Sequence, residues 1–597
     1  MNKDLMVQMG AAQKEAFKYI AFSGGGAKGA IYSGVHETLI QSGVLAGVQE
    51  VAGSSAGAIT AAIVASGISR EDFRNLSQNT NFKDLLGSGT IIPGTDVTVN
   101  AGGEPMEELV RNAINKNITD YLKDADVLEI CNTRIAEVGR ELTALQDNND
   151  QAALDRSEIL QKQQAELQSI TDDGGVKLAE INKRVQETGK VTFGDLDLLH
   201  NLNPSKFKGL VITATNNKTG ELMLFNAKDT PDVEIARAAH ASSSIPYVFK
   251  PVAIDGVEYA DGACYDNIPL KYFNGNDPRN DVQDITDSPD KVRDAKKQGR
   301  ALALAFSSAN EMDTNLNAAV YSGKPNITGT SFMSKVVTVV IKAAQKLGLA
   351  HSLKDYDKKD EATYQEVRNN SLNIIALDTK DVGILSFDAA KDKASYLHVK
   401  GALQTARHFA NHEVGNHHDA NLATKEFMLQ VYEDSHTKKS TISKWKDKIF
   451  GAEEAQNLES LLDCCKVDVW KGKNAQEMLA NFVENAVTNR NGKAVSNTHA
   501  MDKLIETLNN PKTPDSIKMQ FAQLTNIEVV SRVVDTKFQA NDFDALLAKK
   551  NVQKLHTIND ANKSKNKVKN ILKAGKEASM ADKIQQEVAK APSPKGR

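Results

Sequence analysis

Short apolar runs alternate with amphipathic stretches along the first part of the chain. The apolar runs at 19–23 and 48–52 predict two strands, and each is followed by a glycine-rich turn and a segment with helical spacing. The first of these helices carries Ile31, Val35 and Leu39 on one face, and the second begins near Ala58. Two strand–turn–helix units in tandem predict a parallel sheet, with backbone N–H groups gathered where the turns meet the helices.

The same alternation continues to about residue 410. Further strands are predicted at 209–215, 221–225, 252–254, 301–306 and 373–377, a loop followed by a helix at 314–349, and a closing helix at 389–412. Between about 105 and 190 the chain is mostly polar, with leucines at helical spacing, and predicts an inserted helical hairpin broken at 172–175. This insertion is either a lid over a site or a solvated structural excursion.

The character of the chain changes after about residue 415. Strand-like runs nearly vanish, and helical spacing such as that at 475–483 predicts a separate all-α domain over 416–548. The stretch 549–597 holds 13 Lys or Arg against 4 Asp or Glu and few large apolar residues. It is either a tail that binds anionic lipid headgroups or a solvated, partly disordered end. The predicted domains are therefore 1–415, 416–548 and the basic tail.

The second glycine-rich turn has the spacing of a nucleophile elbow. Gly53 and Gly57 flank Ser55 in a Gly-x-Ser-x-Gly pattern between a strand and a helix. Larger flanking side chains would clash in such a tight turn, and the turn lifts the Ser55 hydroxyl above the sheet. A serine hydroxyl is a weak nucleophile by itself, so this site also needs a base and donors for an oxyanion.

Three interpretations compete for the first glycine-rich turn, which consists of Gly24, Gly25, Gly26, Ala27, Lys28 and Gly29. A dinucleotide fingerprint fits the glycine spacing and Glu50 lies at a suitable distance, but a dinucleotide fold has no use for a serine elbow. A phosphate-binding P-loop is excluded because Gly29, not Ser or Thr, follows Lys28. An oxyanion hole facing Ser55 explains both turns together, and we favour it.

The base is harder to find, because none of the 12 histidines stands in a convincing context. His240 follows a helical run and is expected to be a packed or capping residue. The histidines at 412, 417 and 418 with Asp419 lack a second cluster of ligands, so we expect a polar loop and no metal site. Asp261, held by Gly262 and Ala263 after a strand, is the better candidate, provided that partial burial raises its basicity. An ordinary Asp-Gly turn is the alternative.

The three motifs in this order resemble the patatin-like phospholipases. The segments 191–197, 225–232 and 238–246 also resemble parts of the secreted bacterial effector phospholipases of the ExoU and VipD type, so the resemblance spans roughly 15–410. It implies a patatin-like three-layer α/β/α domain with a mainly parallel sheet. It also implies a Ser-Asp dyad of Ser55 and Asp261, an oxyanion loop at 24–29, and a role for Lys28 in steering or orienting either the anionic headgroup or the loop. Membrane glycerophospholipids are the implied substrates.

The effectors that the chain resembles depend on a host protein, ubiquitin in one case and a small GTPase in another. The resemblance therefore implies a host activator, no other cofactor, and a C-terminal region that contacts membranes. The alternative is that this region is chiefly a host-protein binding module with the lipase as its switched output. Nucleotide binding by 24–29 is a third and weaker hypothesis.

Composition narrows the class further. A net charge of -4, with 25% charged and 40% hydrophobic residues, does not indicate a nucleic-acid binder. Cys131, Cys264, Cys464 and Cys465 give no disulfide framework and suit a reducing compartment. We see neither a signal-peptide pattern nor a run of about 20 apolar residues. We therefore expect a protein made in the bacterial cytoplasm, delivered into a host cell, and bound peripherally to host membranes.

Overall fold

The computed structural model describes residues 17–435 with gaps, and scattered residues between 462 and 517. The gaps are 92–97, 125, 147–150, 247, 266, 270–300, 307–373, 381, 413, 416–418 and 420. The chain divides into two compact units, Met1–His417 and His418–Arg597. The loop and helix expected at 314–349 and the basic tail expected at 549–597 lie outside the described residues.

A single eight-stranded sheet organises the described part of the first unit, in the order β10-β9-β1-β2-β5-β8-β7 with β6 paired to β5. The strands are β1 (Tyr19–Phe22), β2 (Glu50–Gly53), β5 (Gly209–Asn216), β6 (Leu222–Phe225), β7 (Val252–Ile254), β8 (Val257–Asp261), β9 (Ala301–Phe306) and β10 (Ile374–Leu377). A separate antiparallel ribbon joins β3 (Thr90–Ile91) to β4 (Thr98–Val99).

The strands from β10 to β5 run parallel to one another, whereas β6, β7 and β8 join antiparallel. All four residues of β1 are buried, as are all four of β2. A parallel strand covered on both faces carries such a continuous apolar run, which is why these strands could be predicted. The expected α/β class with a mainly parallel sheet is confirmed.

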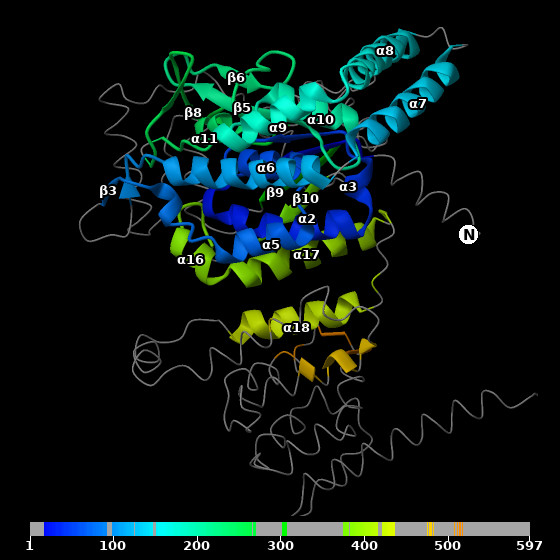
Figure 1. The fold of residues 1–597 in the computed structure, drawn as a ribbon. Helices are drawn as coiled ribbons and strands as arrows, with labels where there is room; N and C mark the ends of the chain where they lie inside the picture. The colour runs from blue at the N-terminus through cyan, green and yellow to red at the C-terminus, as the bar shows by residue number, and fades with distance from the viewer. Residues whose placement is uncertain are drawn as a thin grey trace, which may run out of the picture. The chain divides into compact units, whose positions relative to one another are not determined.

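Helices lie on both sides of this sheet (Figure 1). They are η1 (Gly26–Ile31), α2 (Tyr32–Gln41), α3 (Val44–Gly47), α4 (Ala56–Ala65), α5 (Arg70–Asn79), η2 (Asp84–Leu86), α6 (Glu104–Asp124), α7 (Val127–Leu145), α8 (Gln151–Asp172), α9 (Val176–Thr188), α10 (Phe193–Leu202), α11 (Ile235–Ser242), η3 (Gly262–Cys264), α16 (Phe387–Asp392) and α17 (Ala394–Asn411). The helices α2, α5 and α17 pack side by side. The expected closing helix is two helices, because the chain breaks at Lys393.

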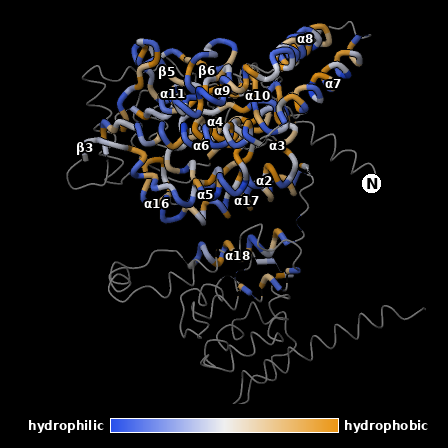
Figure 2. Tube along the Cα trace, viewed as in Figure 1, coloured by the Kyte–Doolittle hydropathy of each residue, from blue (hydrophilic) through white to orange (hydrophobic). Residues whose placement is uncertain are grey.

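The insertion contains four helices rather than a single hairpin. Helix α6 packs on α4 and α11, and therefore belongs to the body of the unit. Helices α7 and α8 form the hairpin and extend away from that body (Figure 1). Blue and orange residues alternate along both helices (Figure 2), as expected for a pair whose facing sides are buried and whose outer sides meet water. The predicted break at 172–175 separates α8 from α9.

The described residues of the second unit are helical, as expected. Helix α18 (Leu422–Ser435) is its longest described element, and Asp434 at its end accepts a hydrogen bond from Thr507 Oγ1 at 3.0 Å. Within the described parts of both units, no helix combines the length and apolar character needed to cross a bilayer.

Candidate active site

The register of the sheet brings the two glycine-rich turns together. Strands β1 and β2 are parallel, with Phe22 opposite Gly53, so both strands end at the same edge. On the other side of β2, Gly53 lies opposite Ile212 of β5. Two residues further along β5, Ala214 lies opposite Asp261 of β8. Asp261 therefore lies two strands away from the elbow, with β5 between them, at the edge of the sheet where β1 and β2 also end.

The elbow around Ser55 is a strained turn that only its glycine neighbours permit. Ser55 has φ 55° and ψ -127°, a conformation that side-chain-bearing residues rarely adopt. A Cβ on Gly53 would lie 2.2 Å from the carbonyl oxygen of Gly57. A Cβ on Gly57 would lie 2.1 Å from the carbonyl oxygen of Phe22. Glycine at both positions therefore lets the turn lie directly on β1.

Ser55 and Asp261 face each other across this edge. Ser55 Oγ donates a hydrogen bond of 2.6 Å to Asp261 Oδ2, and both residues are buried, with 3% and 2% of their surface exposed. Asp261 Oδ1 accepts from the Ala263 N–H at 2.8 Å. Burial raises the pKa of Asp261 to about 7, although the hydrogen bonds from Ser55 and Ala263 favour the charged form. The carboxylate thus has the basicity of an imidazole.

The backbone around Asp261 is fixed as closely as its side chain. Its carbonyl oxygen accepts from Thr215 Oγ1 at 2.9 Å, and a Cβ on Gly262 would lie 2.3 Å from the carbonyl oxygen of Thr213. Strand β8, which ends at Asp261, was not predicted from the sequence. Asp261 is therefore the last residue of a paired strand, and the ordinary Asp-Gly hairpin turn is not what the structure shows.

The first glycine-rich turn lies against the nucleophile. A Cβ on Gly24 would lie 2.9 Å from Ser55 Cβ. The N–H groups of Gly24 and Ala27 are already used, by the carbonyl oxygens of Asn267 at 3.1 Å and Ile384 at 2.8 Å. Among the described residues, the N–H groups of Gly25 and Gly26 have no such acceptor.

Of the two roles expected for Lys28, orienting a headgroup or orienting the loop, its placement agrees with the second. Its side chain is buried, with the residue 4% exposed, and its Nζ lies 5.6 Å from the centre of the Phe306 ring. Its backbone N–H donates to the Gly25 carbonyl oxygen at 3.1 Å. In this conformation Lys28 packs the glycine-rich turn against β9 and is not presented to a ligand.

A small cavity of about 100 Å³ opens beside Ser55. Gly26, Ser55 and Ala56 are among the residues that line it. The rest is mostly apolar and is contributed by α4, α5, α6 and neighbouring segments, including Ile59, Ile63, Phe73, Leu76, Met106, Leu109 and Phe249. The insertion reaches the cavity through α6, and no residue of the α7–α8 hairpin lines it.

Histidines take structural positions among the described residues. His240 is buried, and its Nδ1 lies 2.7 Å from Glu107 Oε2, which ties α11 to α6. His398 Nδ1 lies 3.0 Å from Ser33 Oγ and its Nε2 lies 2.9 Å from Glu37 Oε2. This Ser–His–Glu set is buried between α2 and α17 and lines no cavity beside Ser55. It joins two helices and has no access for a substrate.

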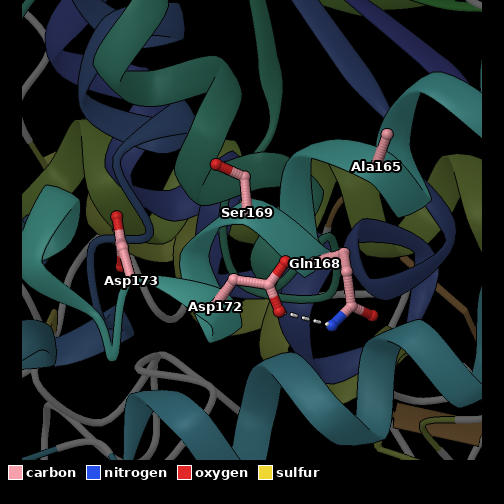
Figure 3. A pocket seen from close by; sticks show the side chains of 5 residues that line it. All are labelled: Ala165, Gln168, Ser169, Asp172 and Asp173. Carbon is pink, nitrogen blue, oxygen red and sulfur yellow. Dashed lines mark hydrogen bonds between the residues drawn. The ribbon is translucent and has the colours of Figure 1, made fainter.

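The remaining candidates hold no metal-binding or ligand-enclosing group. The rings of His412 and His408 lie with their centres 4.5 Å apart and their planes tilted by 50°, while 417 and 418 lie outside the described residues. In the described part of the chain no cluster of His, Cys, Asp and Glu could hold a metal ion. Figure 3 shows a second hollow, lined by Ala165, Gln168, Ser169, Asp172 and Asp173. All five are exposed residues at the end of α8, so this hollow encloses little.

Several residues that hold the site were not singled out from the sequence. Ser242 and Ser243 bond the backbone of Ser55, and the Ser244 carbonyl oxygen bonds the backbone of Asp261. Asn267 and Ile384 hold the glycine-rich turn through their carbonyl oxygens. The only signal in the sequence was the serine run inside the segment 238–246.

A strained serine elbow beside a buried carboxylate, at the edge of a mainly parallel sheet, has the layout of a serine acyl hydrolase. The family described as patatin-like phospholipase matches residues 20–274, the segment that carries the glycine-rich turn, the elbow and Asp261. The resemblance noted from the motifs is confirmed over this segment, which supports a phospholipase among the lipid acyl hydrolases. No curated protein sequence matches the chain.

Several solved structures also resemble the chain at low similarity. VipD from Legionella pneumophila is 18% identical with a TM-score of 0.37, covering 93% of this chain and 90% of that one. The type III effector protein ExoU is 16% identical with a TM-score of 0.32, covering 97% and 90%. The ExoU–SpcU complex from Pseudomonas aeruginosa is 18% identical with a TM-score of 0.33, covering 90% and 89%. We base no conclusion on likenesses of this size.

Proposed function

We propose that the protein is a serine phospholipase that hydrolyses fatty-acyl esters of membrane glycerophospholipids, as a phospholipase A or lysophospholipase. The observation that carries this proposal is the 2.6 Å hydrogen bond from Ser55 Oγ to Asp261 Oδ2. A carboxylate with a pKa of about 7 is a suitable base near neutral pH, because about half of it is ionised there and it still binds a proton well.

The reaction follows from this pair. Asp261 takes the Ser55 proton as Oγ attacks the ester carbonyl carbon, which gives a tetrahedral oxyanion. The intermediate collapses to a serine ester, and Asp261 returns the proton to the departing lysophospholipid oxygen. Water, deprotonated by Asp261, then attacks the serine ester, and the fatty acid leaves as Ser55 regains its proton.

Only some N–H groups of the stretch 24–29 are free to bind the oxyanion. Within the described residues, the N–H groups of Gly25, Gly26 and Ala56 have no protein acceptor, and Gly26 and Ala56 line the cavity with Ser55. Ala56 is also the first residue of α4, whose N-terminus favours negative charge. One such donor typically contributes about 3 kcal/mol to lowering the barrier.

The cavity beside Ser55 suits an acyl chain, because its lining is mostly apolar. Its volume of about 100 Å³ is below the ~300–1,000 Å³ that is typical of ligand pockets. Binding of a whole acyl chain therefore requires side chains of α4, α5 or α6 to move. A closed cavity is consistent with an enzyme that is inactive until it is opened.

We extend the proposal to delivery and activation, for which the effector-like segments are the support. The protein acts at host membranes as a secreted effector, binds them peripherally, and needs a host protein activator of the ubiquitin or small-GTPase kind. The second candidate function is a host-protein binding module in the second unit, with the lipase as its output. The helical character of that unit's described residues is compatible with either role.

The decisive experiment measures fatty-acid release from mixed phospholipid vesicles by the wild type, Ser55→Ala and Asp261→Asn, with and without eukaryotic cell extract. Release by the wild type alone supports the dyad, and dependence on extract supports the activator. Full activity in Asp261→Asn would exclude the dyad. No release by folded wild type under any condition would favour the binding module.

A further inference from the structure

The serine run at the end of α11 contacts both residues of the dyad. Ser242 Oγ accepts a hydrogen bond from the Ser55 N–H at 2.9 Å, and Ser243 Oγ donates to the Ser55 carbonyl oxygen at 3.1 Å. The next residue, Ser244, accepts from the Asp261 N–H through its carbonyl oxygen at 3.0 Å. One short segment therefore holds the main chain of the nucleophile and of its base.

These contacts are made inside the protein, where water cannot replace them. Ser242, Ser243 and Ser244 are 0%, 4% and 1% exposed. Ser243 Oγ also lies 2.8 Å from the Ala239 carbonyl oxygen, so its single proton is shared between α11 and the elbow. A buried N–H group left without a partner is costly, so Ser242 Oγ strongly constrains the Ser55 N–H. The Ser55 carbonyl oxygen also accepts from the N–H groups of Ala58 at 2.8 Å and Ile59 at 3.2 Å, so Ser243 Oγ adds a further contact to a group that is already bonded.

The elbow needs such a constraint because its conformation is strained. Ser55 has φ 55°, so its peptide groups tend to rotate toward a more common conformation unless they are held. Rotation of either flanking peptide swings Cβ and with it Oγ. Since Oγ must stay within hydrogen-bond reach of Asp261 and aligned with the ester, a small rotation slows attack without altering how the lipid binds.

We propose that Ser242 and Ser243 are positioning residues, which clamp the two peptide groups of Ser55 and keep its hydroxyl aimed at Asp261. This inference rests on the proposed function of Ser55 as the nucleophile. The clamp comes from α11, which also packs on α4, so the helix after the elbow and the helix before Asp261 are fixed together.

The experiment measures the labelling rate of the full-length protein by an alkyl fluorophosphonate, which reports the reactivity of a serine without requiring a membrane. Ser55→Ala defines the background. We expect Ser242→Ala and Ser243→Ala to lower the maximal labelling rate by about 10- to 100-fold. The probe concentration at half-maximal rate should stay the same for Ser242→Ala, since Ser242 does not line the cavity.

Matched variants separate positioning from general damage. Ser42→Ala removes another fully buried serine at a helix end, whose Oγ likewise donates to a carbonyl oxygen and accepts from a backbone N–H, and should label at the wild-type rate. Ser243→Thr and Ser243→Val have nearly the same shape and differ in the hydroxyl, so the threonine variant should label faster. Thermal unfolding of each variant checks that it is folded.

The outcomes are distinct. Absence of Ser55-dependent labelling in the folded wild type, both with and without eukaryotic cell extract, overturns the proposed function and this inference with it. Wild-type labelling that is unchanged in Ser242→Ala and Ser243→Ala overturns the clamp alone. Equal labelling rates in Ser243→Thr and Ser243→Val also overturn the clamp, because the slower labelling would then come from altered packing and not from the lost hydroxyl.

Discussion

Replacing Asp261 by asparagine should make the protein inactive and, above neutral pH, more stable. The reason is that the Asp261 carboxylate is buried, and burial raises its pKa from an ordinary value of 3.8 to about 7. In the unfolded chain this group releases its proton near pH 4, whereas in the folded chain it releases it near pH 7. Between these values the folded state holds an extra proton, so its stability falls as the pH rises.

The size of this effect follows from the shift. About three pKa units at 1.36 kcal/mol each give about 4 kcal/mol at high pH, of which about 2.5 kcal/mol develops between pH 5 and pH 8. Asparagine has the same shape and no proton to lose, so the stability of Asp261→Asn should not fall with pH in this way. In a folding unit of about 400 residues, with an unfolding entropy of about 2.1 cal/mol/K per residue, about 2.5 kcal/mol corresponds to a change in Tm of about 3 °C.

Calorimetry of the wild type and Asp261→Asn at pH 5 and pH 8 tests the reasoning. The Tm of the variant minus that of the wild type should be about 3 °C larger at pH 8 than at pH 5. Asp255→Asn is the control, since Asp255 is exposed in the turn of the same β-hairpin and asparagine tolerates its φ of 50°. A difference that is equal at the two pH values would refute the raised pKa of Asp261.

Three further predictions concern the same site. The kcat/KM of the activated wild type should rise with pH, reach half its maximum near pH 7 and level off about one unit higher, because Asp261 must be ionised; a flat profile from pH 5 to 9 would argue against an aspartate base. Gly57→Ala should destabilise the protein by several kcal/mol in a denaturant titration, roughly as overpacking does, because its Cβ would lie 2.1 Å from the Phe22 carbonyl oxygen. Ile59→Trp should fill the cavity and shift fatty-acid release toward shorter chains, measured on esters of graded length, while labelling of Ser55 by a small organophosphate stays unchanged.

The parts of the fold that could be predicted are those with a strong local pattern. Strands β7 and β9 were predicted at their observed bounds, and the two glycine-rich turns indicated the edge of the sheet where the site lies. Strand β8 was missed because Val257 and Glu258 are exposed and an Asp-Gly turn precedes them, which gives no buried run. An antiparallel strand at the side of a parallel sheet carries a weaker signal than a central one.

The partners of the dyad could not be predicted for a different reason. Ser242 and Ser55 are 187 residues apart, and the carbonyl oxygen of Ile384 reaches the glycine-rich turn from still further along the chain. Main-chain groups carry no sequence signal, and a buried serine is not distinguishable in a single sequence from an exposed one. The motifs therefore indicated the reacting groups, while the groups that hold them emerged only from the tertiary structure.

The placement of Asp261 shows how the proposed serine hydrolase would work without a histidine. At its ordinary pKa of 3.8 an aspartate is too weak a base for a serine hydroxyl, and an imidazole with a pKa of about 6.5 is the usual remedy. Here burial brings the carboxylate into the same range. Because β2, β5 and β8 are hydrogen-bonded neighbours, the separation of Ser55 and Asp261 is set by the sheet register and not by a loop. The same free energy of burial thus lowers the stability of the folded protein with a charged Asp261 and raises the basicity of that carboxylate. A variant that lets water reach Asp261 should therefore be more stable and hydrolyse esters more slowly.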